Sequence, residues 1–511
     1  MSTWAQHAER HSPSRRPLLI LAALAALGST AIGLLLATVN PLFGFAGLLI
    51  AAVALGILSN PERATLVVFF VLYSNITVVV IRSGVPSQLA GSFFLLLGLP
   101  LFHILITRRQ RIIITPNMIL MIGYLAVLLL SAAVSDRPDL TFKRIQDYAL
   151  EGLVLYFLVI NVVRQPEMLR RSLWVILLAG ALMGGVTLYQ GITQTFDNDF
   201  GGFAQITESE VSVGQEDYMG NKPVTRRFAG PIGEKNRFAQ ILVVLLPLAT
   251  ALALSERRWA LRLAAGALAL LILGGALYTF SRGAGVAVVM MALALLPLRM
   301  IRPRTAILAG GLAVALILTL APGYVYRLST LGNVSGLFSG DTSEADTSVQ
   351  GRATENLATL LIFVDHPLLG VGPGQTPRFI RDYGRGVGFK LLDPSRRAHN
   401  LYLEELADTG VVGFALFGSI VALTMARLVG VRRRAFGRDR ATFFLASGLL
   451  LSIFTYLVTA VFLHLSYARY YWFLLALAGA AIHIEERRRA GQAHTVPLPQ
   501  STEPATRNES L

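Results

Sequence analysis

The stretch with the clearest potential for chemistry runs from Arg396 to Gly413, where a histidine stands among arginines and carboxylates. Read as a helix, it places polar side chains at every fourth position on one face: Arg396, Asn400, Glu404 and Asp408. His399 lies beside this face, and an imidazole can take a proton from a hydroxyl group near neutral pH. Arg396, Arg397 and Asn400 could bind an anionic leaving group next to it. His399 is therefore a candidate base, although a lone histidine is more often structural.

Three further arginines stand at the ends of apolar segments. Arg226 and Arg227 precede Gly230-Pro231, and Arg282 separates two apolar segments with almost no loop between them. A charge at membrane depth is costly unless it is paired, so such an arginine is a candidate functional residue. Guanidinium groups hold phosphate oxygens in a fork, which indicates an anion site. The simpler alternative for Arg226 and Arg227 is contact with lipid phosphates or with a loop carboxylate.

Other polar patterns carry weaker signals. Lys143, Asp147 and Glu151 recur at helical spacing beside Arg144, which is typical of a helix face whose charges pair with one another; a substrate role is less favoured. The sequence Asp-Asn-Asp at 197–199 matches a short metal and nucleotide-sugar pattern, but no strand-rich nucleotide-binding domain accompanies it. The chain has no cysteine, which excludes disulfides and thiolate metal sites. The sequence thus offers no motif for a metal or a cofactor.

Composition indicates which elements must position these residues. The chain has 511 residues, of which 54% are hydrophobic and only 15% are charged. The charged residues lie between apolar runs that are long enough to cross a hydrocarbon core about 30 Å thick. The net charge of +15 is divided among short arginine clusters between these runs, so it indicates membrane topology and offers no continuous basic face for nucleic acid. We predict an all-α, polytopic protein surrounded by membrane lipids.

The apolar runs number fourteen, and twelve spans are the alternative because two of the connections are very tight. Basic clusters fall at alternate ends of the runs, which by the positive-inside rule places both termini in the cytoplasm. Two long polar intervals then face the outside. The second contains an amphipathic helix at 352–365, followed by a tight turn at Pro367 and 370–374.

The expected segments follow from these runs. In chain order they are a cytoplasmic N-terminus (1–16), N-terminal transmembrane helices (17–192), a first periplasmic loop (193–235), central transmembrane helices (236–321), a large periplasmic catalytic loop (322–410), C-terminal transmembrane helices (411–484) and a disordered cytoplasmic tail (485–511). Loops as long as these two beside a compact bundle are usually functional or disordered.

Four short motifs occur in a fixed order along the chain. They are Arg-Phe-Ala-Gly-Pro at 227–231 with Asn236, Phe-Ser-Arg-Gly at 280–283, Arg352 with Asp-His-Pro-Leu-Leu-Gly-Val-Gly at 365–372, and His-Asn-x-Tyr-Leu-x-x-Leu-x-x-x-Gly at 399–410. In these motifs and in loop placement, the chain resembles the bacterial O-antigen ligase and O-antigen polymerase superfamily over roughly 117–484. It departs from the usual ligase pattern in its longer first outer loop and in two additional spans.

The resemblance implies a metal-independent, inverting membrane glycosyltransferase in the bacterial inner membrane, with its active site facing the periplasm. Its donor would be a glycan on undecaprenyl pyrophosphate, and its acceptor a hydroxyl of another glycan or lipid in lipopolysaccharide, O-antigen or exopolysaccharide biosynthesis. Carried over residue by residue, His399 would be the base. Arg227 and Arg282 would hold the pyrophosphate, with Arg226 and Arg352 as further substrate-binding residues.

Two questions stay open at the level of sequence. The motifs do not separate a polymerase, which extends a carrier-linked chain, from a ligase, which transfers the finished glycan to its final acceptor. The alternative from another class is a solute or anion transporter, for instance of bicarbonate. Transporters usually carry charges at the bilayer midplane in repeated halves. The clustering of arginines and histidine at one surface favours the enzyme.

Overall fold

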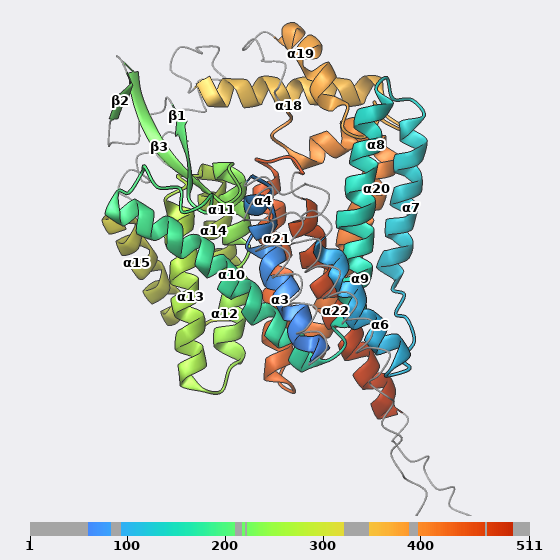
Figure 1. Ribbon diagram of the computed structural model, residues 1–511, viewed down its shortest axis with the longest axis vertical. Coiled ribbons are helices and arrows are strands. Elements are labelled where there is room, and N and C mark those ends of the chain that lie inside the picture. The colour runs from blue at the N-terminus through green and yellow to red at the C-terminus, as the bar shows by residue number, and fades with distance from the viewer. Residues whose placement is uncertain are drawn as a thin grey trace, which may run out of the picture.

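The computed structural model describes residues 60–82, 93–209, 217–219, 222–320, 347–387, 397–465 and 468–493 (Figure 1). The first two predicted spans, Pro17–Val39 and Leu42–Leu58, lie outside these residues, as does most of the predicted C-terminal tail.

Within the described ranges, six helices are long and apolar enough to cross a membrane. They are Pro138–Val162, Pro166–Thr193, Lys235–Ser255, Trp259–Leu277, Leu401–Ala435 and Arg440–Ala460. Each contains a predicted span or most of one, so the architecture fits the predicted multi-pass membrane protein. The total of about fourteen spans stays a prediction.

The helices of the first half of the chain are labelled in Figure 1. They are α3 (Pro61–Tyr73), α4 (Ile76–Arg82), the 3₁₀ helix η1 (Phe93–Leu97), α6 (Gly98–Ile106), α7 (Pro116–Ala132), α8 (Pro138–Asp147), the π-helical turn η2 (Tyr148–Val154), α9 (Leu155–Val162) and α10 (Pro166–Thr193). α8, η2 and α9 form one continuous helix.

The second half is also mainly helical. Its helices are α11 (Lys235–Val243), α12 (Leu246–Ser255), α13 (Trp259–Leu277), α14 (Arg282–Leu295), α15 (Pro303–Leu320), α18 (Thr347–Asp365), α19 (Thr376–Val387), α20 (Leu401–Ala435), α21 (Arg440–Ala460) and α22 (Ala468–Ala493). α18 lies across one end of the bundle, roughly perpendicular to the upright helices, with α19 above it (Figure 1). We call this the α18 end.

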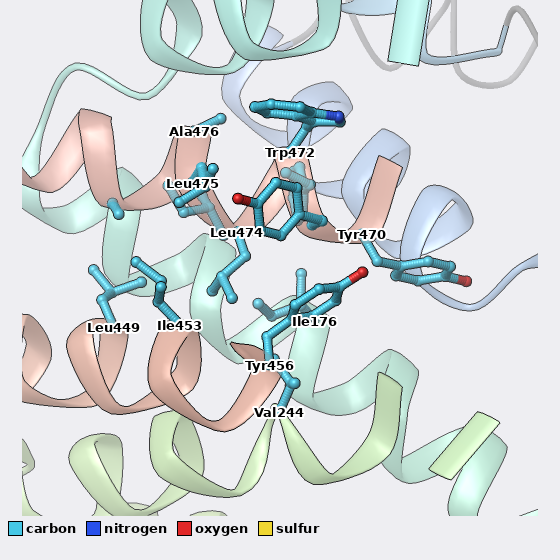
Figure 2. Close-up of a cluster of buried hydrophobic side chains, with 14 of the residues drawn as sticks. Ile176, Val244, Leu449, Ile453, Tyr456, Tyr470, Trp472, Leu474, Leu475 and Ala476 are labelled. Carbon is cyan, nitrogen blue, oxygen red and sulfur yellow. The ribbon is translucent and has the colours of Figure 1, made fainter. Parts of the chain in front are cut away.

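The packed centre of the bundle lies where α21 and α22 meet α10 and α12. Figure 2 shows Leu449, Ile453 and Tyr456 of α21 facing Leu474 and Leu475 of α22. Lipid is as apolar as these side chains, so close packing is what stabilises their contact in a membrane. The centre therefore acts as a rigid support for the polar groups at the α18 end.

Two predicted spans are interrupted in the structure. Ala64–Ile81 divides at Asn75, whose φ of 61° ends α3 before α4 begins. The Asn75 side chain donates a hydrogen bond of 2.9 Å to the Pro231 carbonyl and accepts one from Arg469. Asn236–Leu254 divides into α11 and α12 ahead of Pro247, whose nitrogen has no hydrogen to donate to a continuous helix.

The first polar interval contains strands, so the all-α prediction needs a correction. β1 (Gln205–Ser209), β2 (Asp217–Met219) and β3 (Lys222–Gly230) form an antiparallel sheet in the order β1–β3–β2. It lies at the α18 end (Figure 1). β3 carries Pro223 and three basic residues, so the apolar alternation that normally identifies a strand is missing from its sequence. The described chain is nevertheless mostly helical, as predicted.

The second polar interval contains the predicted amphipathic helix, here α18, and the predicted turn after it. Residues 367–374 pack directly against the backbone of α20. Val371 N donates to Ala407 O at 2.9 Å, Gly372 N to Asp408 O at 3.0 Å, and Val411 N to Pro367 O at 2.8 Å. These bonds fix α18 relative to α20.

The predicted helix over 396–413 is correct only in part. Asn400 is the N-cap of α20 and its Oδ1 accepts bonds from Tyr402 N and Leu403 N, so the helix begins at Leu401. His399 consequently precedes the helix and does not lie beside its polar face. The predicted break at Gly410 is present, with φ 64° and ψ −171°.

Gly410 is expected to be essential for this packing. A Cβ atom there would lie 2.1 Å from the Leu368 carbonyl oxygen, and its positive φ adds backbone strain for any other residue. We predict that Gly410→Ala lowers the unfolding free energy by at least about 2 kcal/mol, because strain and clash act together. Thermal unfolding of the detergent-solubilised protein measures the effect.

Gly418→Ala in the same helix is the matched control, because no atom lies within 4 Å of the added methyl group. It should change stability by less than about 1 kcal/mol. Equal unfolding temperatures for the two variants would contradict the proposed packing.

Candidate functional site

A polar cavity lies at the α18 end, where segments far apart in sequence meet. It measures about 420 Å³, including space open to solvent. Its polar lining residues are Arg227, Asn236, Ser281, Arg282, Arg352 and Thr459. We call it the arginine cavity. Three of the arginines singled out in the sequence thus line one cavity, although they come from β3, α14 and α18.

Arg227 is buried and held by backbone groups. Its Nε donates to Thr279 O at 2.8 Å, and its Nη2 donates to Phe280 O and Asn236 Oδ1, both at 3.1 Å. Successive side chains of a strand point to opposite sides. Arg226 accordingly lies elsewhere, with its guanidinium carbon 4.6 Å from the centre of the Phe196 ring, and is absent from the cavity lining.

Arg282 is the first residue of α14, with Ser281 as the N-cap. Backbone amides and the helix dipole make a helix N-terminus favourable for anions. Arg282 is buried, and Arg352 approaches from α18. None of the described residues that line the cavity is acidic. The cavity is therefore electropositive and suited to a phosphate-containing group.

His399 lies outside the cavity lining but is held by the same helix, α18, that supplies Arg352. Its Nδ1 is 2.6 Å from Oε2 of Glu355, a carboxylate with no exposed surface. The same nitrogen is 3.1 Å from the carbonyl oxygen of Arg397. Two acceptors at Nδ1 favour the tautomer with its proton there, which leaves Nε2 able to accept a proton.

Glu355 was not identified from the sequence. It is 44 residues before His399, and the local sequence carries no catalytic motif around it. The one available signal is its position one helical turn after Arg352, which places both side chains on the same face of α18.

His464 connects the histidine region to the cavity. Its ring centre is 6.0 Å from that of His399, and it directly follows Leu463, which lines the arginine cavity. Burial and the nearby positive charge of Arg237 hold the pKa of His464 well below its usual value. The ring is therefore neutral and adds no positive charge beside His399.

Arg237 supports this connection from α11. It donates to the His464 carbonyl oxygen and, at 2.8 Å, to Gln240 Oε1. Gln240 Nε2 donates at 2.7 Å to Thr459 Oγ1, and Thr459 lines the cavity. A buried hydrogen-bonded chain thus fixes the wall between His464 and the arginine cavity.

Two other predicted binding residues, Asn400 and Arg397, are absent from the lining of the arginine cavity. Asn400 uses its side chain to cap α20, and Arg397 is exposed. Arg396 lies outside the described residues.

The charged face of α8 interacts within itself, where Arg144 and Lys143 lie near Asp147, and it also pairs with other helices. Arg144 Nη2 lies 3.7 Å from Glu404 Oε1 on α20, and Glu151 Oε1 lies 3.9 Å from Arg469 Nη1 on α22. Helical periodicity showed which residues share a face but not which helix would cover that face.

The Asp-Asn-Asp pattern at 197–199 forms a turn. Asn198 Oδ1 accepts from Phe200 N at 2.8 Å, and Asp199 Oδ1 accepts from Gly201 N at 3.0 Å. Across the described part of the chain, no group of three or more histidine and carboxylate side chains is arranged to hold a metal ion.

Fold and site together define a helical membrane protein with an arginine-lined cavity and a carboxylate-supported histidine at one end of its bundle. A comparison with known protein families supports one class of protein. Residues 267–418 match the family model of O-antigen ligase, and the predicted resemblance to the O-antigen ligase and polymerase superfamily is thereby confirmed. The matched segment includes Arg282, Arg352 and His399. No curated protein matches the chain significantly.

The arginine cavity should bind inorganic pyrophosphate. A hydrogen bond between charged groups contributes about 1.5–3 kcal/mol, so Arg282→Ala or Arg352→Ala should weaken binding at least about tenfold. Isothermal titration calorimetry on the purified protein measures the dissociation constant.

Arg378→Ala on α19 is the control, because that arginine is half-exposed and pairs with Asp136 at 3.4 Å. It should bind like the wild type. A similar loss in all three variants, or in none, would show that pyrophosphate binds elsewhere.

Proposed function

We propose that the protein transfers a glycan from undecaprenyl pyrophosphate to an acceptor hydroxyl. The observation that carries this proposal is the convergence of Arg227, Arg282 and Arg352 on one cavity at the same end of the bundle as His399. An anionic leaving group and a proton acceptor are the two requirements of the reaction. The family match supports a glycan-transfer enzyme on independent grounds.

In the proposed reaction, His399 Nε2 takes the proton of the acceptor hydroxyl. The hydroxyl oxygen attacks the anomeric carbon from the face opposite the carrier, and the bond from that carbon to the pyrophosphate oxygen breaks. The bonding electrons leave with the pyrophosphate, whose growing negative charge is stabilised by the three arginines and the N-terminus of α14. One direct displacement inverts the anomeric configuration, and the proposal requires no metal.

Glu355 acts in this proposal as a positioning residue. Its carboxylate accepts the Nδ1 proton, orients the ring and stabilises the imidazolium that forms when Nε2 takes the second proton. Because Glu355 and Arg352 belong to one helix, the base and part of the leaving-group site are positioned together.

The proposal also gives the protein an orientation in the membrane. The α18 end faces the periplasm of the inner membrane, where the carrier presents its glycan, and the bundle gives the undecaprenyl tail an apolar surface. The transporter alternative has no observation in its favour among the described residues.

A direct assay tests the proposal. The purified protein, incubated with a carrier-linked glycan and an acceptor, should release undecaprenyl pyrophosphate and lengthen the acceptor. Inactivity across suitable donors, together with solute uptake by vesicles that contain the protein, would reject the enzyme in favour of the transporter.

His399→Ala should reduce transfer at least about 100-fold, since general-base catalysis typically contributes that much.

Glu355→Gln should lower kcat about tenfold or more while KM changes little, because the amide keeps a hydrogen bond but not the charge. His103→Ala, on α6 away from the α18 end, should retain activity. Wild-type transfer by well-expressed His399→Ala protein would remove this histidine from the mechanism.

The subtype can be assigned from the glycan gel profile of a deletion strain. A single repeat unit left on the acceptor would identify a polymerase, whereas bare acceptor with carrier-linked polymer would identify a ligase.

A further inference from the structure

A second cavity lies beside the first, and the proposed reaction does not use it. It measures about 450 Å³, including space open to solvent. The residues that determine its chemistry are Tyr124, Arg144, Asp147, Tyr148, Glu405 and Trp472. We call it the aromatic cavity. They come from α7, α8, η2, α20 and α22, so this site too is assembled from segments far apart in sequence.

The charged residues that line the aromatic cavity differ from those of the arginine cavity. Asp147, Glu405 and Asp408 line it against the single cation Arg144 among the described lining residues. Arg144 already forms an ion pair with Glu404, with 3.7 Å between Nη2 and Oε1. This lining lacks the group of arginines that would hold a pyrophosphate, so the cavity is not a second copy of the leaving-group site.

Its aromatic wall is continuous. The ring centres of Tyr124 and Tyr148 are 5.0 Å apart, and those of Tyr148 and Trp472 are 5.3 Å apart. Figure 2 shows Trp472 pointing away from the Tyr456 and Leu449 side chains of α21. Tyr148 belongs to the π-helical turn η2, a local irregularity that is frequent at functional sites.

Trp472 also provides an unused donor. Its side chain is buried, yet Nε1 has no hydrogen-bond partner among the described residues. A buried donor without a partner is costly, which points to a ligand that accepts this bond. The half-buried Asp147 carboxylate adds an acceptor, so donor and acceptor stand beside an aromatic surface.

This combination matches the chemistry of a neutral saccharide. Its C–H faces pack on aromatic rings, and its hydroxyl groups both donate to carboxylates and accept from indole and guanidinium N–H groups. A purely apolar ligand would leave the polar groups unpaired.

The position of the cavity relates it to the reaction. Leu463 lines the arginine cavity, Leu465 lines the aromatic cavity, and His464 stands between them with its ring 6.0 Å from that of His399. Leu465 N is held by Glu404 Oε2 at 3.2 Å. The two cavities thus adjoin one short segment that His399 contacts.

We propose that the aromatic cavity binds the acceptor as a neutral saccharide, while the arginine cavity binds the donor pyrophosphate. This inference rests on the proposed glycan transfer. It assigns the two substrates to separate sites on either side of 463–465, with His399 beside that segment.

Binding can be tested without catalysis. Neutral oligosaccharides released by mild acid from surface glycans of the source cells should change the tryptophan fluorescence of the purified full-length protein. The change should be absent in Trp472→Phe, which keeps a ring but lacks the N–H group. Inorganic pyrophosphate should neither produce this change nor compete with the saccharide. No saccharide response, the same response in Trp472→Phe, or competition by pyrophosphate would overturn the assignment.

Kinetics provide the second test. Trp472→Phe and Asp147→Asn should each raise the acceptor KM about threefold to tenfold, the effect of one lost hydrogen bond, and leave the donor KM unchanged. Asp139→Asn, exposed on the same helix and paired with Arg137 at 3.0 Å, should behave like the wild type. An altered donor KM with an unchanged acceptor KM would overturn the acceptor site. A wild-type protein that transfers no glycan would instead reject the proposed function, while the binding test would still decide whether the cavity takes a saccharide.

Discussion

The arrangement of the site depends on the close approach of residues 367–374 to the break in α20. The positive φ values of Gly370 and Gly410 let two backbones meet where Cβ atoms would clash. Asp408 strengthens the contact, since its carboxylate accepts from Gly374 N at 2.7 Å and from Thr376 Oγ1 at 2.6 Å. This contact fixes α18, and α18 carries both Arg352 and Glu355. Gly370 and Gly410, which belong to two of the motifs that resemble the family, therefore have a structural role that does not depend on catalysis.

Charge divides the α18 end into two environments. The arginine cavity gathers cations from three segments with no acidic residue in its described lining, whereas the aromatic cavity has more carboxylates than cations. Between them, the neutral His464 and the Glu355-supported His399 form a polar boundary. Such a division would keep a pyrophosphate leaving group and an uncharged acceptor from exchanging places, which is the specificity that a transfer reaction requires.

Much of this arrangement could be predicted from the sequence, because hydropathy and charge placement are strong signals in membrane proteins. Most of the described helices, the amphipathic α18 and the candidate residues Arg227 and Arg282 follow from them, whereas Arg352 was predicted only from the family resemblance. The strand β3 did not, since its basic residues and Pro223 hide the alternation of a strand. His399 was placed inside a helix because periodicity outweighed the capping signal of Asn400. Glu355 and the partners of Arg144 depend on tertiary contacts between distant helices, which no local pattern encodes.

In the proposed mechanism, the three arginines hold the pyrophosphate of a lipid-linked donor beside His399. A cryo-electron microscopy structure with a non-hydrolysable phosphonate analogue of a carrier-linked glycan would test it most directly. The proposed mechanism predicts phosphonate and phosphate oxygens within hydrogen-bonding distance of Arg227, Arg282 and Arg352, with the first sugar extending toward His399. Density for the charged group in the aromatic cavity, or at the end of the bundle opposite α18, would contradict it.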